Sequence, residues 1–509
     1  MLNRFLTTNG APSELEAKEV QRMSDEALET RLRNELHIRR LQNKAGSETT
    51  VKTLECDNSS LRRTIRRCRS ILSPVRRLPP EILTHIFILT TPSVEETKNV
   101  PWYRSLEQSP WTLGRICRRW RAVALSSPAL WSSIVIQNIG FEPCSIPMLK
   151  TQLTRSGSYP LVVVFEYEAD GRNGYVVQKA MKSLAKCSPR WKSLSITAEQ
   201  FKRLLNVCGR VPLPEKLSVV GTEEEETDDG YGSGSSSQAI RHFAIAPRLR
   251  VVEMETGTPF FDVPLAHLTH YESNGSWEDH IHALKALRNV ESCSPMFAHE
   301  FSGHDPFKWV SRTVELPKLW KLDLTMKLDL TMERYIFREL SWTWPKSLRV
   351  PALTSLTIDD SLLRGLPELL QSSMCRLTTL SVNGGCPRVE AIRPVFESTP
   401  DLVELCIDLH HHRSLFNTQA HVTELIALLT LEPHTPLVLP KLQTLGIFAP
   451  QMEFENVIGT MISSRWSTTD PAVSRLRSVD IMDGSRMGRC LAARLEKLRG
   501  EGLGVSVRG

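Results

Sequence analysis

The chain has 509 residues, of which 41% are apolar and 24% charged, and its formal net charge is +6. This composition is typical of a soluble globular chain with about two to four domains, and it argues against a disordered or membrane protein. The sequence lacks a long apolar run and an apolar signal segment, so we expect no membrane span. Its eleven cysteines form no C-x-x-C pair, so we expect no disulfide framework and no zinc site, and a cytoplasmic or nuclear location.

The first predicted element is a long helix over residues 13–45. The segment combines strong helix formers with charges of both signs, and Leu28, Leu32, Leu36 and Leu41 form a narrow apolar seam. Such a seam predicts either a short coiled coil, through which the chain self-associates, or a solvated helix that leads into the next domain.

A second amphipathic segment covers residues 61–77. It holds seven arginines and no acidic residue, with Leu61, Ile65 and Cys68 on the opposite face of a helix. The basic face fits a nuclear-import signal or a contact with a phosphate backbone, whereas the alternative is a solvated helix that packs against the following module. Because no aromatic residues are interleaved, binding of single-stranded nucleic acid is not favoured.

Two apolar helices are predicted between residues 78 and 131. The first begins at LPPEIL, where prolines occupy the first turn and Glu81 lies at the positive end of the helix dipole. The second covers residues 113–124 and is ended by the SSP at 126–128, and a short turn at 128–131 closes the module. A module of about fifty residues is too small to close a core alone, so we expect a partner or the next domain to cover it. The first helix has one predicted apolar stripe, formed by Ile82, Leu83, Ile86 and Phe87.

The pattern LPPEIL–IF, then CRRW, then P-x-LW resembles the F-box family over this stretch. The link at residues 90–111 is longer than the family's usual link, and such inserts are familiar in the mushroom-type fungal branch that the chain resembles. The resemblance implies that the module docks on a Skp-type adaptor of a cullin ubiquitin ligase. An ordinary helical hairpin is the alternative.

The residues assigned to adaptor docking come from both halves of the module. Those of the second half either join the contact or hold the module together, and Trp120 is interpreted as core. The full set is Leu78, Pro79, Pro80, Ile82, Leu83, Ile86, Phe87, Leu113, Cys117, Trp120, Leu130 and Trp131.

Strands and helices alternate after the module. Strands are predicted at residues 133–136, 160–167 and 191–196, and helices at 146–156 and 175–187. Short strands that alternate with helices predict parallel βα units.

An internal repeat, Pro-x-Leu-x-x-Leu-x-Leu with other apolar residues allowed, recurs through the rest of the chain. Its last two apolar residues are two apart, as one face of a strand requires, and the pattern is the L-x-x-L-x-L core of leucine-rich repeats. The spacings are long and irregular, so we predict a divergent solenoid with inserts, and a generic α/β domain is the alternative. Copies begin at Pro189, Pro247, Pro317, Pro351, Cys375, Pro400, Pro440 and Ser474, with weaker copies at Leu268 and Leu287, and helix candidates cover residues 362–371, 389–396, 422–431 and 454–462.

Three other segments are interpreted as loops. The acidic and Gly/Ser-rich stretch at 222–237 predicts a disordered loop. The tandem duplication at 321–332 extends a strand or bulges out, and His410–His412 point in different directions on any strand, so a metal site is not favoured. Because no catalytic motif is present, we expect no enzyme and no cofactor.

The predicted fold is α+β and multidomain. It consists of an N-terminal helical or coiled-coil region (1–72), a small all-α F-box (73–132) and an α/β leucine-rich-repeat-like solenoid (133–509). The predicted function is a substrate-receptor subunit of an SCF-type ligase, with the adaptor and an unknown protein substrate as partners. The alternatives are an interaction scaffold that acts without ubiquitin ligase assembly and, less favoured, nucleic-acid association through residues 62–77.

Overall fold

The chain forms two compact units, Met1–Trp191 and Lys192–Gly509, in the computed structural model. The predicted domain boundaries at residues 72 and 132 both fall inside the first unit and remain predictions. The structure describes residues 2–8, 10–42, 47–97, 109–137, 145–166, 174–202, 204, 207, 211–221, 243–254, 263–275, 277–297, 313–324, 348–408, 418–432, 437–448, 454–482 and 488–507.

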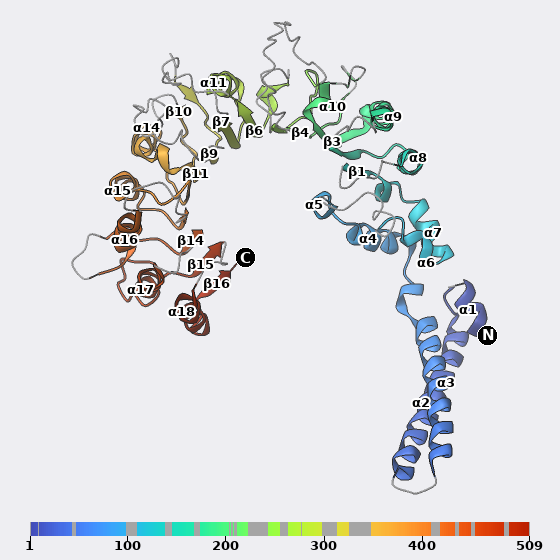
Figure 1. Cartoon of the computed structure of the whole chain (residues 1–509). Helices are drawn as coiled ribbons and strands as arrows, with labels where there is room; N and C mark the ends of the chain where they lie inside the picture. Colours follow the sequence, from blue (N-terminus) through green and yellow to red (C-terminus); the bar gives the residue numbers. More distant parts are fainter. Residues whose placement is uncertain are drawn as a thin grey trace. The chain divides into compact units, whose positions relative to one another are not determined.

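The first unit begins with α1 (Leu2–Thr8) and a helical hairpin of α2 (Glu14–Leu41) and α3 (Glu48–Leu72), which run side by side in opposite directions (Figure 1). Helix α2 starts at a capping box, in which the Ser13 hydroxyl accepts from the Glu16 N–H and the Glu16 carboxylate accepts from the Ser13 N–H.

The buried face of α2 is not the leucine seam. The helix buries Val20, Ser24, Ala27 and Ile38, whereas Leu28, Leu32 and Leu36 are 37%, 51% and 55% exposed. Three of the four leucines of the predicted seam are therefore turned away from the interior of the hairpin.

A small helical module follows the hairpin. It consists of η1 (Pro74–Arg76), α4 (Pro80–Thr90), α5 (Val94–Thr97), α6 (Leu113–Ile116), α7 (Arg118–Leu125) and η3 (Pro128–Trp131).

The single helix predicted over residues 113–124 is two helices, α6 and α7, in the structure. Cys117 has extended backbone (φ −159°, ψ 168°) and separates them. Its Sγ accepts a hydrogen bond of 3.4 Å from the Trp120 N–H, so the side chain satisfies a donor at the start of α7 and the break is stabilised locally.

The remainder of the first unit matches the predicted alternation of strands and helices. Strands β1 and β2 pair in parallel, with Ser133 opposite Val162. The elements are β1 (Ser133–Gln137), α8 (Ile146–Arg155), β2 (Leu161–Glu166), α9 (Gly174–Ala185) and η4 (Ser188–Arg190).

The second unit is a large parallel sheet with the order β3-β4-β5-β6-β7-β9-β11-β12-β13-β14-β15-β16, and β8 pairs with β10 separately. Neighbours in the large sheet follow the order of the sequence, and only β8 and β10 among the described strands of this unit are left out of it. The first elements are β3 (Trp191–Thr197), α10 (Ala198–Lys202), β4 (Lys216–Val220), β5 (Val251–Met254), η5 (Leu265–His267), β6 (His270–Gly275), α11 (Trp277–Ala286), β7 (Ser292–Phe297), β8 (Val314–Glu315) and β9 (Lys321–Leu324).

The later part of this unit repeats strand and helix regularly. All four predicted helices between the repeats are present, with bounds shifted by a few residues. The elements are β10 (Leu348–Arg349), β11 (Ser355–Asp359), η6 (Asp360–Gly365), α14 (Leu366–Ser373), β12 (Thr379–Asn383), α15 (Val389–Ser398), β13 (Glu404–Asp408), α16 (Thr418–Leu429), β14 (Thr444–Phe448), α17 (Glu455–Trp466), β15 (Ser478–Met482), α18 (Arg489–Gly500) and β16 (Gly504–Val507).

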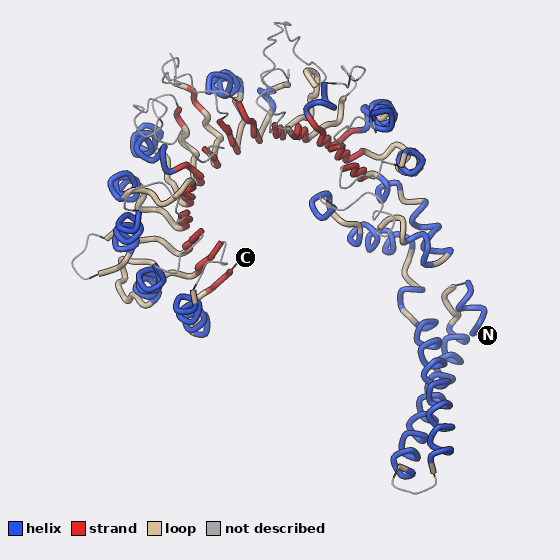
Figure 2. Tube along the Cα trace, viewed as in Figure 1, coloured by secondary structure: helices blue, strands red, loops and turns tan. Residues whose placement is uncertain are grey.

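The repeated leucines form the core between the sheet and its helices. In the copy that begins at Pro351, Leu353, Leu356 and Ile358 are all fully buried. Helices α14 to α18 lie on one face of the sheet, and the described residues place no helix on the other face (Figure 2). The expected α+β fold with N-terminal helices and a large parallel sheet is confirmed.

A buried arginine joins three segments near the C-terminal end. The Arg465 guanidinium on α17 donates to the carbonyl oxygens of Leu429 (2.6 Å), Val438 (2.8 Å) and Leu439 (3.1 Å). Burial lowers the pKa of this guanidinium to about 10, so it stays charged at neutral pH.

Several predicted features lie outside the described residues. They are the segment 222–237, the second part of the duplication at 325–332 and His410–His412.

Candidate functional site

Helix α4 presents two different apolar faces. Pro79 is its N-cap, Pro80 occupies the first helical position and Glu81 lies in the first turn. Leu83 and Phe87 are buried, whereas Ile82 and Ile86, one residue before each, are 45% and 37% exposed. Successive helical residues are about 100° apart, so the predicted single stripe is divided between the interior and the surface.

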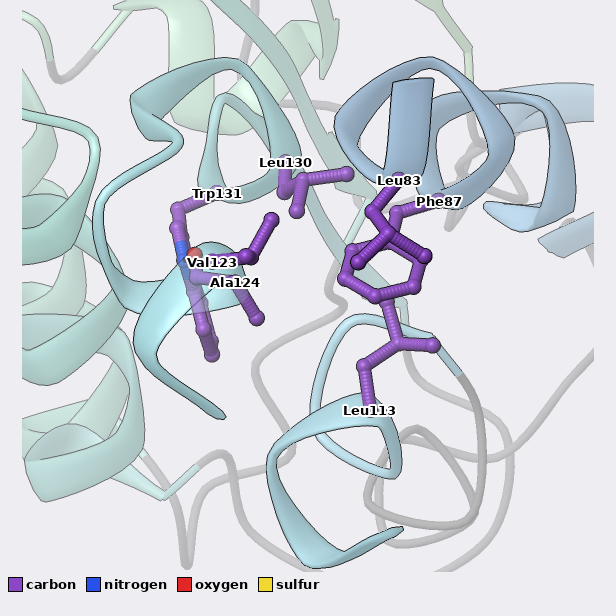
Figure 3. Packing of buried hydrophobic residues seen from close by; sticks show 7 residues of the cluster. All are labelled: Leu83, Phe87, Leu113, Val123, Ala124, Leu130 and Trp131. Carbon is purple, nitrogen blue, oxygen red and sulfur yellow. Dashed lines mark hydrogen bonds between the residues drawn. The ribbon is translucent and has the colours of Figure 1, made fainter. Parts of the chain in front are cut away.

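The buried face of α4 holds the core of the module. Phe87 packs against Trp120 with ring centroids 4.8 Å apart, and Trp111 meets Trp131 edge to face at 5.0 Å. Leu78, Trp111 and Trp120 are partly buried against this core. Figure 3 shows its buried members, Leu83, Phe87, Leu113, Val123, Ala124, Leu130 and Trp131.

This burial divides the predicted docking residues, and for Leu113, Leu130 and Trp131 it agrees with the expected alternative that they hold the module together. Leu83, Phe87, Leu113, Leu130 and Trp131 are almost completely buried, so they cannot reach a partner unless the module rearranges. They hold the module together, as Trp120 was expected to do, and Cys117 serves as the cap of α7.

The exposed apolar surface of α4 extends further than the sequence indicated. Leu89 is 85% exposed and lies three residues after Ile86 and seven after Ile82. Residues at these spacings share one helix face. We call Ile82, Ile86 and Leu89 the α4 stripe. The 3.6-residue period could have identified Leu89 if the buried and exposed faces had been separated.

Other exposed apolar side chains surround or accompany the module. Pro79 and Pro80 are exposed at the start of α4, and Leu78 is half-buried. Val75, Ile88, Ile116 and Leu125 are also exposed, although the sequence analysis did not assign them to docking. The module therefore exposes apolar side chains outside the α4 stripe as well.

Two arginines fix the chain that enters α4. Arg119 of α7 donates to the carbonyl oxygens of Arg76 and Leu78. The buried Arg76 guanidinium donates to the carbonyl oxygens of Phe5 (2.8 Å) and Gly10 (3.3 Å), and its desolvation lowers its pKa. These bonds satisfy backbone acceptors just before α4 and at the N-terminal end of the chain, and they hold the segment that leads into α4.

A basic pocket of about 180 Å³ lies beside the closing turn of the module. The Arg155 guanidinium stands over the rings of Trp131 (4.4 Å) and Trp111 (5.2 Å), and Arg115 and Arg121 also line the pocket. The cation–π contacts tie α8 to the module.

The second unit presents a mixed polar surface on the helix-free face of its sheet. On β13, Leu405 and Ile407 are buried, while Glu404, Cys406 and Asp408 alternate with them. Burial raises the pKa of the Cys406 thiol, and it raises the pKa of Cys386 to about 12. Both thiols stay protonated at neutral pH, which is the opposite of what a nucleophilic cysteine requires.

The described residues contain no cluster of three or more potential metal ligands. In the same part of the chain, no helix combines the length and apolar character needed to cross a bilayer. No protein-family model matches the sequence, and a search of curated proteins also finds no match.

Proposed function

We propose that the chain is a non-catalytic substrate-receptor subunit of an SCF-type cullin ubiquitin ligase, in which residues 73–132 act as an F-box. The observation that carries this proposal is the α4 stripe. Ile82, Ile86 and Leu89 form an exposed apolar face on a helix whose other apolar face is already buried. A surface of this kind on a small module is typical of a protein-binding site.

The α4 stripe fits an apolar groove on a partner. It presents apolar side chains at i, i+4 and i+7, the spacing with which a helix is recognised in an apolar groove. Pro79 and Pro80 extend the exposed surface at its N-terminal end. The F-box resemblance supplies the identity of the partner, a Skp-type adaptor. The adaptor contact then consists of Pro79, Pro80 and the α4 stripe, with Leu83 and Phe87 fixing the orientation of the helix.

We assign substrate binding to the helix-free face of the second unit, which we propose is a leucine-rich-repeat-like solenoid. Support comes from the repeated buried leucines and from parallel strands that follow one another in sequence order. Solenoids use extended strand faces of this kind to bind proteins.

Ubiquitin transfer would take place on other subunits of the ligase. The receptor contributes proximity, because holding a substrate near the charged ubiquitin carrier raises its effective concentration. We place this work in the cytoplasm or the nucleus. This role needs no cofactor and no catalytic residue of the chain itself.

The second candidate function is an interaction scaffold that does not join a ligase. The exposed leucines of α2 favour it, because they offer a protein-binding surface outside the module. The two functions differ in one requirement, since only the receptor must bind the adaptor. Nucleic-acid association through the arginines of α3 is the third interpretation, and it predicts binding that weakens steeply with salt.

The test measures binding of the purified full-length chain to a purified Skp-type adaptor by isothermal titration calorimetry. We expect the wild-type chain to bind and an Ile82→Glu/Leu89→Glu variant not to bind. The matched control is Ile88→Glu, because Ile88 is exposed on the same helix but lies outside the α4 stripe. Circular dichroism verifies that both variants keep their helices. A folded wild-type chain that does not bind the adaptor would overturn the proposal, and the scaffold would become the leading function.

A further inference from the structure

The longest helix of the first unit carries a row of exposed leucines. Leu28, Leu32 and Leu36 are spaced four residues apart on α2 and are 37%, 51% and 55% exposed. Helix α3 packs on another face of α2, where Val20 and Ala27 are buried. The α2–α3 hairpin, whose course Figure 1 shows, therefore buries other residues of α2 and leaves the leucine row exposed among the described residues.

Opposite charges lie at the two ends of this row. Asp25 precedes Leu32 by seven residues and Arg39 follows it by seven, so all three lie on nearly the same side of the helix. The Asp25 carboxylate accepts a hydrogen bond of 2.9 Å from the Gln21 amide. Among the described residues, no ion pair links Asp25 to a basic residue, whereas the Arg39 guanidinium interacts with the Glu35 carboxylate one turn before it and helps to lower the pKa of that carboxyl. The row thus has an acidic residue at one end and, at the other end, a basic residue that also interacts with Glu35 of its own helix.

We propose that a second copy of this chain packs against the leucine row with its α2 antiparallel to the first. The two-fold axis passes beside Leu32, which faces Leu32 of the second copy. Leu28 then faces Leu36 of the second copy, and Asp25 faces Arg39 of the second copy at both ends. A two-fold interface requires a self-complementary surface, and the row satisfies this requirement.

The charges decide between the two orientations of the helices. In an antiparallel pair, each end of the interface brings an aspartate to an arginine. In a parallel pair in the same register, Asp25 would face Asp25 and Arg39 would face Arg39. Like charges that face one another across a helical interface repel, so they disfavour the parallel pair.

The size of the row indicates a weak and reversible dimer. The three leucines cover eight residue steps, or about 12 Å of helix. A stable interface buries about 800 Å² on each partner, which is more than three half-exposed leucines provide. Self-association should therefore depend on protein concentration.

The test follows the oligomeric state of the full-length chain by sedimentation velocity over a concentration series. We expect a shift from monomer to dimer for the wild type and a loss of the dimer for Leu32→Glu. The matched control is Leu15→Glu, which changes a more exposed leucine of α2 outside the row and should leave the dimer intact. A wild-type chain that is monomeric at every concentration, or a dimer that survives Leu32→Glu, would overturn the proposal.

Charge exchange tests the orientation separately. For an antiparallel pair, Asp25→Arg and Arg39→Asp should each weaken dimerisation, by roughly tenfold at low salt, and the double variant should restore it. In a parallel pair, each of these changes leaves like charges facing one another at both ends. Dimerisation would then show neither the loss nor the recovery. Absence of recovery in the double variant contradicts the antiparallel arrangement. These measurements do not involve the adaptor, so their failure would leave the proposed function untouched.

Discussion

Truncation of two neighbouring residues of α4 should affect two different properties of the chain, its stability and its affinity for the adaptor. Leu83 is 1% exposed and lies in the core of the module, whereas Ile82 is 45% exposed on the α4 stripe. We therefore expect Leu83→Ala to reduce the stability of the module and Ile82→Ala to reduce its affinity for the adaptor. The pair separates residues that hold the fold from residues that make the contact.

The two effects differ in size as well as in kind. Leu83→Ala removes buried methyl groups and leaves a cavity, which destabilises a protein by about 2–5 kcal/mol. Ile82→Ala should change the free energy of unfolding by less than about 1 kcal/mol, because much of the side chain is already in water and alanine is the better helix former. Burial of the remaining 45% of Ile82 by a partner contributes about 1 kcal/mol, so its loss weakens adaptor binding roughly fivefold.

Hydrogen-exchange mass spectrometry of the full chain, read on peptides from residues 78–91, reports the local stability of α4. Calorimetric titration with the adaptor reports the affinity. Leu83→Ala should accelerate exchange strongly, and Ile82→Ala should leave it nearly unchanged. If Leu83→Ala lowers affinity without accelerating exchange, Leu83 is a contact residue and the division of α4 into two faces is incorrect.

Two further predictions concern stability. Arg465→Met removes three hydrogen bonds to buried carbonyl oxygens, and in urea unfolding it should destabilise the second unit by about 3 kcal/mol or more. Arg465→Lys should lose less stability, because it keeps the charge. Equal stability of Arg465→Met and the wild type would contradict this role. The backbone hydrogen bond from Ser13 holds the pKa of Glu16 below its ordinary value of 4.5. The capping box therefore stabilises α2 fully above pH 4.5, and this stabilisation is lost as the pH falls through the lower pKa that Glu16 has in the folded chain. Amide exchange in the first turns of α2 should rise in that acidic window beyond its intrinsic pH dependence, and Glu16→Gln should abolish this rise; an identical profile in the variant would show that Glu16 is not responsible.

The repeat was the most predictable part of the fold. Each copy places three apolar residues at fixed spacing, and residues such as Leu353, Leu356 and Ile358 are buried as this spacing requires. Two strands of the large sheet lay outside that pattern, β4 (KLSVV) and β16 (GVSV), as did the two-residue strands β8 and β10. They were not predicted, because a short apolar run without the full repeat does not distinguish a strand from a loop.

The faces of the helices were less predictable than the helices themselves. In α2 the leucines suggested the packing surface, but the structure buries Val20, Ser24 and Ala27 instead. Small residues allow two helices to approach closely, and a search for the largest apolar residues overlooks them. In α4 nearly every residue after Glu81 is apolar or β-branched, so periodicity could not separate Ile82 from Leu83. Which face of such a helix is buried depends on the elements that pack against it.

Dimerisation and adaptor docking can take place on the same molecule. They use different helices of the first unit, since the leucine row lies on α2 and the α4 stripe lies on α4. Occupation of one surface therefore need not cover the other. A dimer would carry two substrate-binding surfaces and two docking modules, so a substrate with two recognition segments would gain effective concentration from the second contact. The Leu32→Glu variant should then bind the adaptor with unchanged affinity but hold such a substrate more weakly, which separates the contribution of the dimer from that of docking.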